Sequence, residues 1–147
     1  MPIKCTTDMS KLFAKIDAKT EEAKASYTEA FEMACRDIVN LAKKTNTYKD
    51  QTNNLRSSIG FILYDRGELV TENFGMAGKG IEGDGSKGIV EGRRIAEEAA
   101  KTHPESLIGV IVAGMEYALY VEAKGYDVLT GSCLQAQTVL EKYIKAL

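Results

Sequence analysis

Residues 107–129 read LIGVIVAGMEYALYVEAKGYDVL, and the rest of the chain is organised around them. The first eight, residues 107–114, carry only apolar side chains or glycine. This run is too short to cross a bilayer and is rich in branched side chains, so it predicts a buried strand. Gly114 ends the strand, and Gly125 permits a second turn before the C-terminal part of the chain.

Beyond this turn the sequence predicts a helix from about Asp127 to the last residue. Apolar residues recur there at steps of three and four, the spacing of a helix with one buried stripe: Leu129, Cys133, Ala136, Leu140, Tyr143 and Leu147. The strand, the connecting residues and this helix, residues 107–147, are expected to pack as one unit.

The apolar residues in the connecting segment 117–123 fit both the two-residue period of a strand and the three- and four-residue spacing of a helix. Alternate residues would share one face of a strand, whereas residues three and four apart would share one face of a helix, so both interpretations stay open. Glu122 is the lone charge in this apolar run. A buried carboxylate without partners costs several kcal/mol, so we expect Glu122 to be at least half buried and bonded to backbone amides or to Arg56.

The N-terminal residues 8–44 predict a long amphipathic helix, with a break near Thr20 left open. Its apolar positions again recur at three- and four-residue steps: Met9, Leu12, Phe13, Ile16, Ala23, Tyr27, Ala30, Phe31, Ala34, Ile38 and Leu41. A continuous helix would be about 50 Å long, which exceeds the width of a compact domain of this size. Its outer part is therefore expected to contact either this chain's own sheet or another subunit.

Residues 57–74 predict a β-hairpin. The first strand, residues 57–64, alternates so that Ile59, Phe61 and Leu63 share one face. A turn at residues 65–67 leads back into a second strand at residues 68–74. Arg56, just before the hairpin, is interpreted as a solvated or interface-forming cation and not as a catalytic one.

Residues 75–92 form a glycine-rich loop in this prediction, with a short helix from Val90 to Thr102 after it. The segment holds seven of the chain's 13 glycines. It contains neither a Walker-type phosphate loop nor a dinucleotide fingerprint followed directly by a helix, and it has too few acids for a calcium loop. Because glycine loses much conformational freedom on ordering, residues 75–88 are expected to be mobile until a partner fixes them.

Composition places the chain in the globular class. With 147 residues it is most simply one domain, 1–147, and the architecture expected is α+β, a small antiparallel sheet packed by a long N-terminal helix and a C-terminal helix. A net charge of −2 argues against general nucleic-acid binding. The three widely spaced cysteines suggest free thiols, and we expect no metal, no cofactor, no catalytic residue and no membrane segment.

Two short segments stand in a fixed order, TNNLRSSI at residues 52–59 and YALYVE at residues 117–122. Together they resemble the head-to-tail joining and tail-completion proteins of long-tailed bacteriophages and prophages. That family pairs a Thr-Gly-Asn-Leu-Arg-like segment entering its first strand with a Tyr-Ala-x-Tyr-Val-Glu segment late in the chain. The pattern differs at Asn53, where glycine is usual, and at Lys124, where an aromatic residue often precedes the glycine. The matching residues are Leu55, Arg56, Tyr117, Ala118, Tyr120, Val121, Glu122 and Gly125.

The resemblance implies a structural protein of the virion, made in the bacterial host cytoplasm. Such proteins form homo-oligomeric rings that contact the phage connector or adaptor and the tail tube. A ring requires one patch to meet a different patch on the next copy. The candidates for these patches are Leu12, Phe13 and Ile16 on the outer helix and Gly78, Lys79 and Gly80 in the glycine-rich loop. The alternatives are a small non-catalytic binding domain of unrelated role and, more distantly, a nucleotide-binding enzyme.

Overall fold

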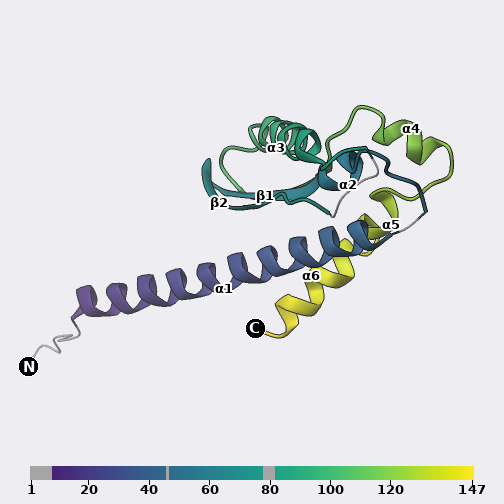
Figure 1. The fold of residues 1–147 in the computed structure, drawn as a ribbon. Coiled ribbons are helices and arrows are strands. Elements are labelled where there is room, and N and C mark those ends of the chain that lie inside the picture. The colour runs from purple at the N-terminus through teal and green to yellow at the C-terminus, as the bar shows by residue number, and fades with distance from the viewer. Residues whose placement is uncertain (1–7, 46, 78–81) are drawn as a thin grey trace, which may run out of the picture.

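The computed structural model describes residues 8–45, 47–77 and 82–147 and has the α+β architecture that the sequence predicts. Three layers are stacked, with α3 on one face of a small sheet and α1 on the other (Figure 1). In chain order the elements are α1 Met9–Lys44, α2 Asn54–Ser57, β1 Ile59–Asp65, β2 Glu68–Asn73, α3 Ser86–Ala100, β3 Leu107–Ala113, α4 Ala118–Ala123, α5 Thr130–Cys133 and α6 Ala136–Lys145.

The sheet has the order β2-β1-β3, and both pairs of neighbouring strands are antiparallel. The hairpin turn is formed by Arg66 at φ 49° and Gly67 at φ 83°, the two positive φ angles that a tight two-residue hairpin turn uses. The predicted hairpin and the predicted strand at residue 107 are therefore confirmed. The first strand begins at Ile59 and not at residue 57, because residues 54–57 form the helical turn α2.

The two faces of β1 build two separate clusters, as its alternating sequence predicts. Ile59, Phe61 and Leu63 lie in the larger cluster, together with residues of α1, α2 and the C-terminal segment. Ile62 packs with Ala96 and Ala100 of α3 on the other face. The central strand is thus covered on both sides, and its side chains Ile59, Phe61, Ile62 and Leu63 are each fully buried.

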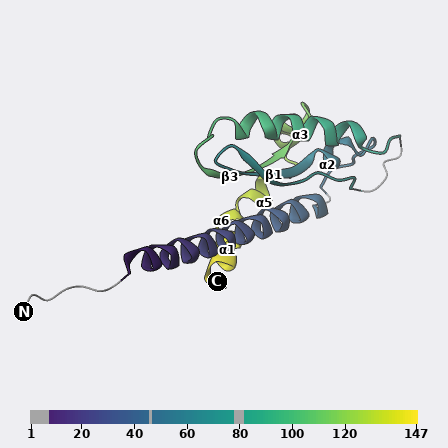
Figure 2. The same ribbon diagram turned by 90° about the vertical axis from the view of Figure 1, so that its left-hand side faces the viewer.

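Helix α1 is continuous past Thr20, so the possible break there is excluded. Asp8 caps its N-terminus by accepting a hydrogen bond from the Ser10 amide at 3.1 Å. Burial begins only at Ala30, whereas every residue from 8 to 25 is exposed. At about 1.5 Å per residue the 36-residue helix is about 54 Å long, and its first half projects beyond the sheet (Figures 1 and 2).

The glycine-rich segment is shorter than the predicted loop 75–92, because its last residues, 86–92, belong to α3. Gly88 and Gly92 face inward, with the backbone of α2 and of Ser58, the residue that follows it, directly against them. A Cβ added at Gly88 would overlap the Asn54 carbonyl oxygen, and one at Gly92 would overlap the Ser58 carbonyl oxygen. These glycines therefore serve close helix packing and not a loop. The inward face of the helix is formed by Gly88, Gly92, Ala96 and Ala100.

The C-terminal helix is also corrected, since it is divided into α5 and α6 and begins at Thr130 and not at Asp127. Cys133, expected in the buried stripe, is exposed. Helix α6 packs along α1, and the Tyr143 hydroxyl donates a hydrogen bond to the Asp37 carboxylate of α1. This arrangement places the chain's last helix beside the buried half of α1 (Figure 1).

Candidate interaction surface

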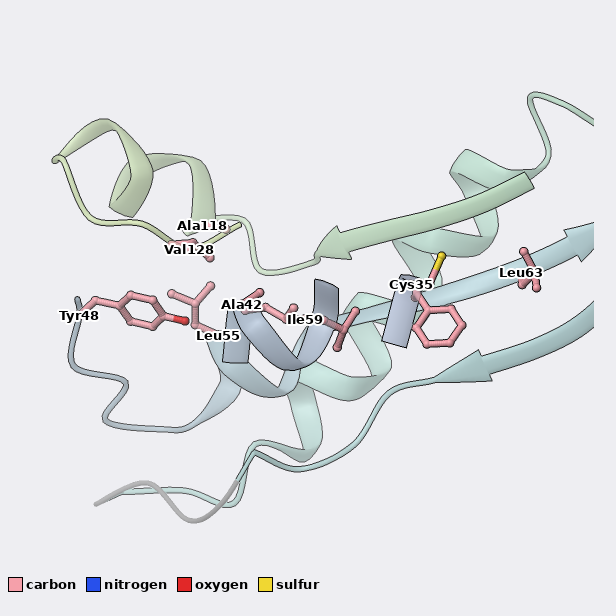
Figure 3. Close-up of a cluster of buried hydrophobic side chains, with 10 residues drawn as sticks. Cys35, Ala42, Tyr48, Leu55, Ile59, Leu63, Ala118 and Val128 are labelled. Carbon is pink, nitrogen blue, oxygen red and sulfur yellow. The ribbon is translucent and has the colours of Figure 1, made fainter. Parts of the chain in front are cut away.

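The two segments that carry the family resemblance meet in the larger core cluster. Leu55 from the first segment is only 2% exposed, and Ala118 from the second lies in the same cluster. Figure 3 shows both side chains gathered with Tyr48 and Val128. Residues more than sixty positions apart in sequence are thus brought together as part of the core.

Arg56 lies in α2 and contacts the segment that connects α1 to α2. Its guanidinium lies over the Tyr48 ring, 5.1 Å from the ring centroid, and donates hydrogen bonds to the Thr45 and Tyr48 carbonyl oxygens at 3.4 and 3.3 Å. Its backbone amide donates to the Asp50 carboxylate at 2.8 Å. Arg56 therefore holds the connection between α1 and α2 in place, and the expectation of a solvated or interface-forming cation is corrected to a partly buried one that bonds within the subunit.

Asn53 and Gly125 both adopt left-handed backbone conformations, with φ angles of 60° and 88°. Glycine adopts this region without steric cost, and asparagine is among the few other residues that tolerate it. Asn53 is also buried and immediately precedes α2. The departure from glycine at this position therefore preserves the backbone geometry that glycine would provide.

Glu122 fixes the turn that follows α4. Its Oε1 atom accepts hydrogen bonds from the backbone amides of Val128, Leu129 and Thr130 at 3.2, 2.7 and 2.9 Å. The residue is partly buried, so the expected burial and the expected amide partners are confirmed, while Arg56 is not the partner. Burial raises the pKa of Glu122, but the amide hydrogen bonds outweigh it and the net pKa lies below its usual range.

We predict that Glu122→Gln lowers the free energy of unfolding by about 1–2 kcal/mol at pH 7, because an ionised acceptor of three backbone amide hydrogen bonds is replaced by a neutral one. A lowered folded-state pKa means that the carboxylate stabilises the fold above its unfolded pKa, and that this contribution is lost as pH falls through the folded pKa. The difference between wild type and variant, measured by urea unfolding, should therefore shrink as pH falls below about 4.5. A pH-independent difference would contradict this role.

Residues 118–123 are helical, which decides between the two periods left open by the sequence. Ala118 is buried and Val121 packs against the core. Leu119 and Tyr120 point outward, with 80% and 63% of their surface exposed. Tyr117, at 40% exposure, immediately precedes the helix.

In the described part of the chain, the side chains that could take part in catalysis or metal binding do not gather at one place. His103 is exposed beside Thr102, and Cys133 is exposed on α5. Among residues 8–45, 47–77 and 82–147, no group of three or more His, Cys, Asp or Glu side chains is placed to hold a metal ion. None of the helices described there is both long and apolar enough to cross a membrane.

The projecting half of α1 carries an exposed apolar row, which we call the α1 stripe: Met9, Leu12, Phe13 and Ile16. Their exposed fractions are 48%, 43%, 57% and 51%. Most helical stability in proteins comes from tertiary packing of the apolar face, yet every residue from 8 to 25 is exposed in the subunit. The stripe is therefore the strongest candidate contact surface of the subunit. The other candidates, Gly78, Lys79 and Gly80, lie outside the described residues.

A second surface feature was not predicted from the sequence. An apolar groove of about 290 Å³ lies between α1, β3 and α6, and we call it the α1–α6 groove. It is lined chiefly by Phe31, Cys35, Ile38, Ile111, Leu140 and Gln137. The lining comes from three elements, and no local sequence pattern specifies how they are arranged. The only available signal was the periodic spacing of apolar residues in α1 and α6.

The comparisons with known proteins found no family model, no curated protein and no solved structure that matches this chain.

Proposed function

We propose that this chain is a structural protein of a tailed bacteriophage or prophage particle. In this proposal it is made in the host cytoplasm, becomes part of the virion, and joins head to tail or completes the tail as a homo-oligomeric ring. Its partners are further copies of itself, the connector or adaptor, and the tail tube. The phage assignment is supported by the resemblance of residues 52–59 and 117–122.

The observation that carries the assembly role is the α1 stripe on a helix half that projects from the domain. A binding site for a small molecule would be concave with convergent polar groups, whereas this surface is convex, apolar and extended. Large exposed apolar rows on otherwise polar surfaces mark protein contacts. The α1 stripe is therefore suited to packing against another protein.

The strength of this contact also fits an assembly protein. Burying the α1 stripe removes roughly 400 Å² of apolar surface from water, worth about 10 kcal/mol at about 25 cal/mol per Å². The loss of rotational and translational freedom on association costs about 4–15 kcal/mol, so the contact alone gives little net affinity. We therefore expect weak self-association of the pure protein and ring formation only where a neighbouring protein adds contacts.

Electron microscopy of the full-length protein mixed with a portal-bound connector tests the proposal. Closed rings on the connector are expected, and few or none without it. The neighbouring genes give an independent check, because a portal protein, a major capsid protein and a tail tube should be encoded beside this one. A tight two-fold dimer that ignores the connector would favour the unrelated binding domain instead.

A further inference from the structure

Helix α6 is held to the rest of the subunit by few contacts. None of its ten residues is buried, since six are exposed and the other four are half-buried. Among the described residues, neither core cluster on β1 includes a residue of α6, and the one hydrogen bond from an α6 side chain to another element joins Tyr143 to Asp37. Segments with few buried apolar contacts are those that open locally before the whole domain unfolds.

The face of α1 that α6 covers continues the α1 stripe. Ala34 and Ile38 are buried but belong to neither core cluster of the described structure. They line the α1–α6 groove together with Ala136 and Leu140 of α6. Ala34 comes eighteen residues after Ile16, which is five turns of about 3.6 residues, so both side chains project from the same side of this continuous helix.

We propose that α6 is a releasable cover of α1, which opens as a unit while α1 and the sheet stay folded. In the closed subunit this face of α1 is exposed from Met9 to Tyr27, about 27 Å of helix, and release of α6 extends it to Ile38, about 44 Å. The cover therefore limits the apolar surface that α1 offers to another protein. The release is a property of the subunit alone, whereas its use in assembly rests on the proposed function.

Release of α6 breaks its backbone hydrogen bonds but leaves the core intact. Isolated helices shorter than about 12–15 residues are marginal in water, so the ten residues of α6 do not stay helical once they leave α1. Both core clusters remain, because the described chain builds them from other elements. The opening therefore exposes only a small part of the surface that global unfolding exposes.

Native-state hydrogen exchange of the full-length protein at rising urea concentration tests the release. The amides of residues 140–145 bond within α6. They should exchange at least about 100-fold faster than those of β1, through one common opening that depends little on urea. Exchange of α6 only through global unfolding, or protection that falls steadily towards the chain end as in fraying, would contradict the cover.

A thiol placed under α6 provides a second readout. Ala34→Cys is compared with Ala96→Cys, which is fully buried between α3 and the sheet, both in a background of Cys5→Ser, Cys35→Ala and Cys133→Ser. Ala34→Cys should react with a thiol reagent at least about 100-fold faster, because only Ala96→Cys requires the core to open. Equal rates would show that α6 does not open on its own.

The effect of the cover on assembly is tested by loosening it. Tyr143→Phe removes the hydrogen bond to Asp37 and should raise both the exchange rate of α6 and the association constant of the pure protein by about 3- to 10-fold. The matched control Tyr120→Phe, exposed on α4, should change neither. Faster exchange without stronger association would show that the cover does not limit assembly.

Failure of the cover and failure of the proposed function give different results. If rings form on the connector while α6 exchanges only together with β1, the cover is wrong and the ring stands. If α6 opens as described and the protein forms no ring on any connector, the proposed function is wrong and the release of α6 stands.

Discussion

Replacing Gly88 with alanine should destabilise the fold by about 3 kcal/mol, although alanine in a helix is normally more stable than glycine by about 1 kcal/mol. Gly88 is buried in α3, and its amide donates to the Asn54 side chain at 3.2 Å. An added Cβ would overlap the Asn54 carbonyl oxygen and lie 2.8 Å from its carbonyl carbon. These are backbone atoms, so α3 would have to move away from α2. Urea unfolding followed by circular dichroism measures the loss.

Gly75→Ala is the matched control, because a Cβ at Gly75 meets nothing within 4 Å and its φ is not positive. This substitution should leave the free energy of unfolding unchanged or raise it by up to about 1 kcal/mol. Equal effects of Gly75→Ala and Gly88→Ala would show that α3 does not pack closely against α2.

Phe61→Ala should cost about 3–5 kcal/mol of folding free energy, because Phe61 is fully buried at the centre of β1 and its removal leaves a cavity. Phe13→Ala removes the same atoms from a side chain that is 57% exposed, and should change the stability of the subunit by less than about 0.5 kcal/mol. Thermal and urea unfolding of the two variants measures this contrast.

The pair of phenylalanine variants separates residues that hold the fold from residues available for assembly. A large loss of subunit stability in Phe13→Ala would mean that the projecting half of α1 folds back onto its own domain. The α1 stripe would then be part of the core and could not serve as a contact surface.

The sequence correctly predicted the helices and strands in which apolar residues recur at a regular spacing. The alternation of Ile59, Phe61 and Leu63 specified the buried face of β1. The periodic apolar residues of α1 specified its bounds and its stripe, although they left open whether the helix continues past Thr20. Glu122 was also predicted correctly, because a lone carboxylate in an apolar run requires hydrogen-bond donors. In each case the physical requirement acts within one element or one turn.

The features that sequence reasoning missed depend on contacts between distant elements. Glycine density indicated a loop at residues 75–92, yet the four-residue spacing of Gly88, Gly92, Ala96 and Ala100 is that of one helical face. That spacing was the available signal for the start of α3 at Ser86, four residues before the predicted start at Val90. The C-terminal segment is divided into α5 and α6, and α6 forms one side of the α1–α6 groove. Both features depend on how this segment packs against α1, which the spacing of apolar residues within one helix does not specify.

The most direct test of the assembly role is sedimentation velocity of the pure full-length protein over a wide concentration range, with and without the portal-bound connector. The α1 stripe gives little net affinity by itself, so we predict a monomer or a weak association alone and one discrete ring-sized species with the connector. A stable two-fold dimer at all concentrations, unchanged by the connector, would contradict the assembly of this protein into a ring through α1.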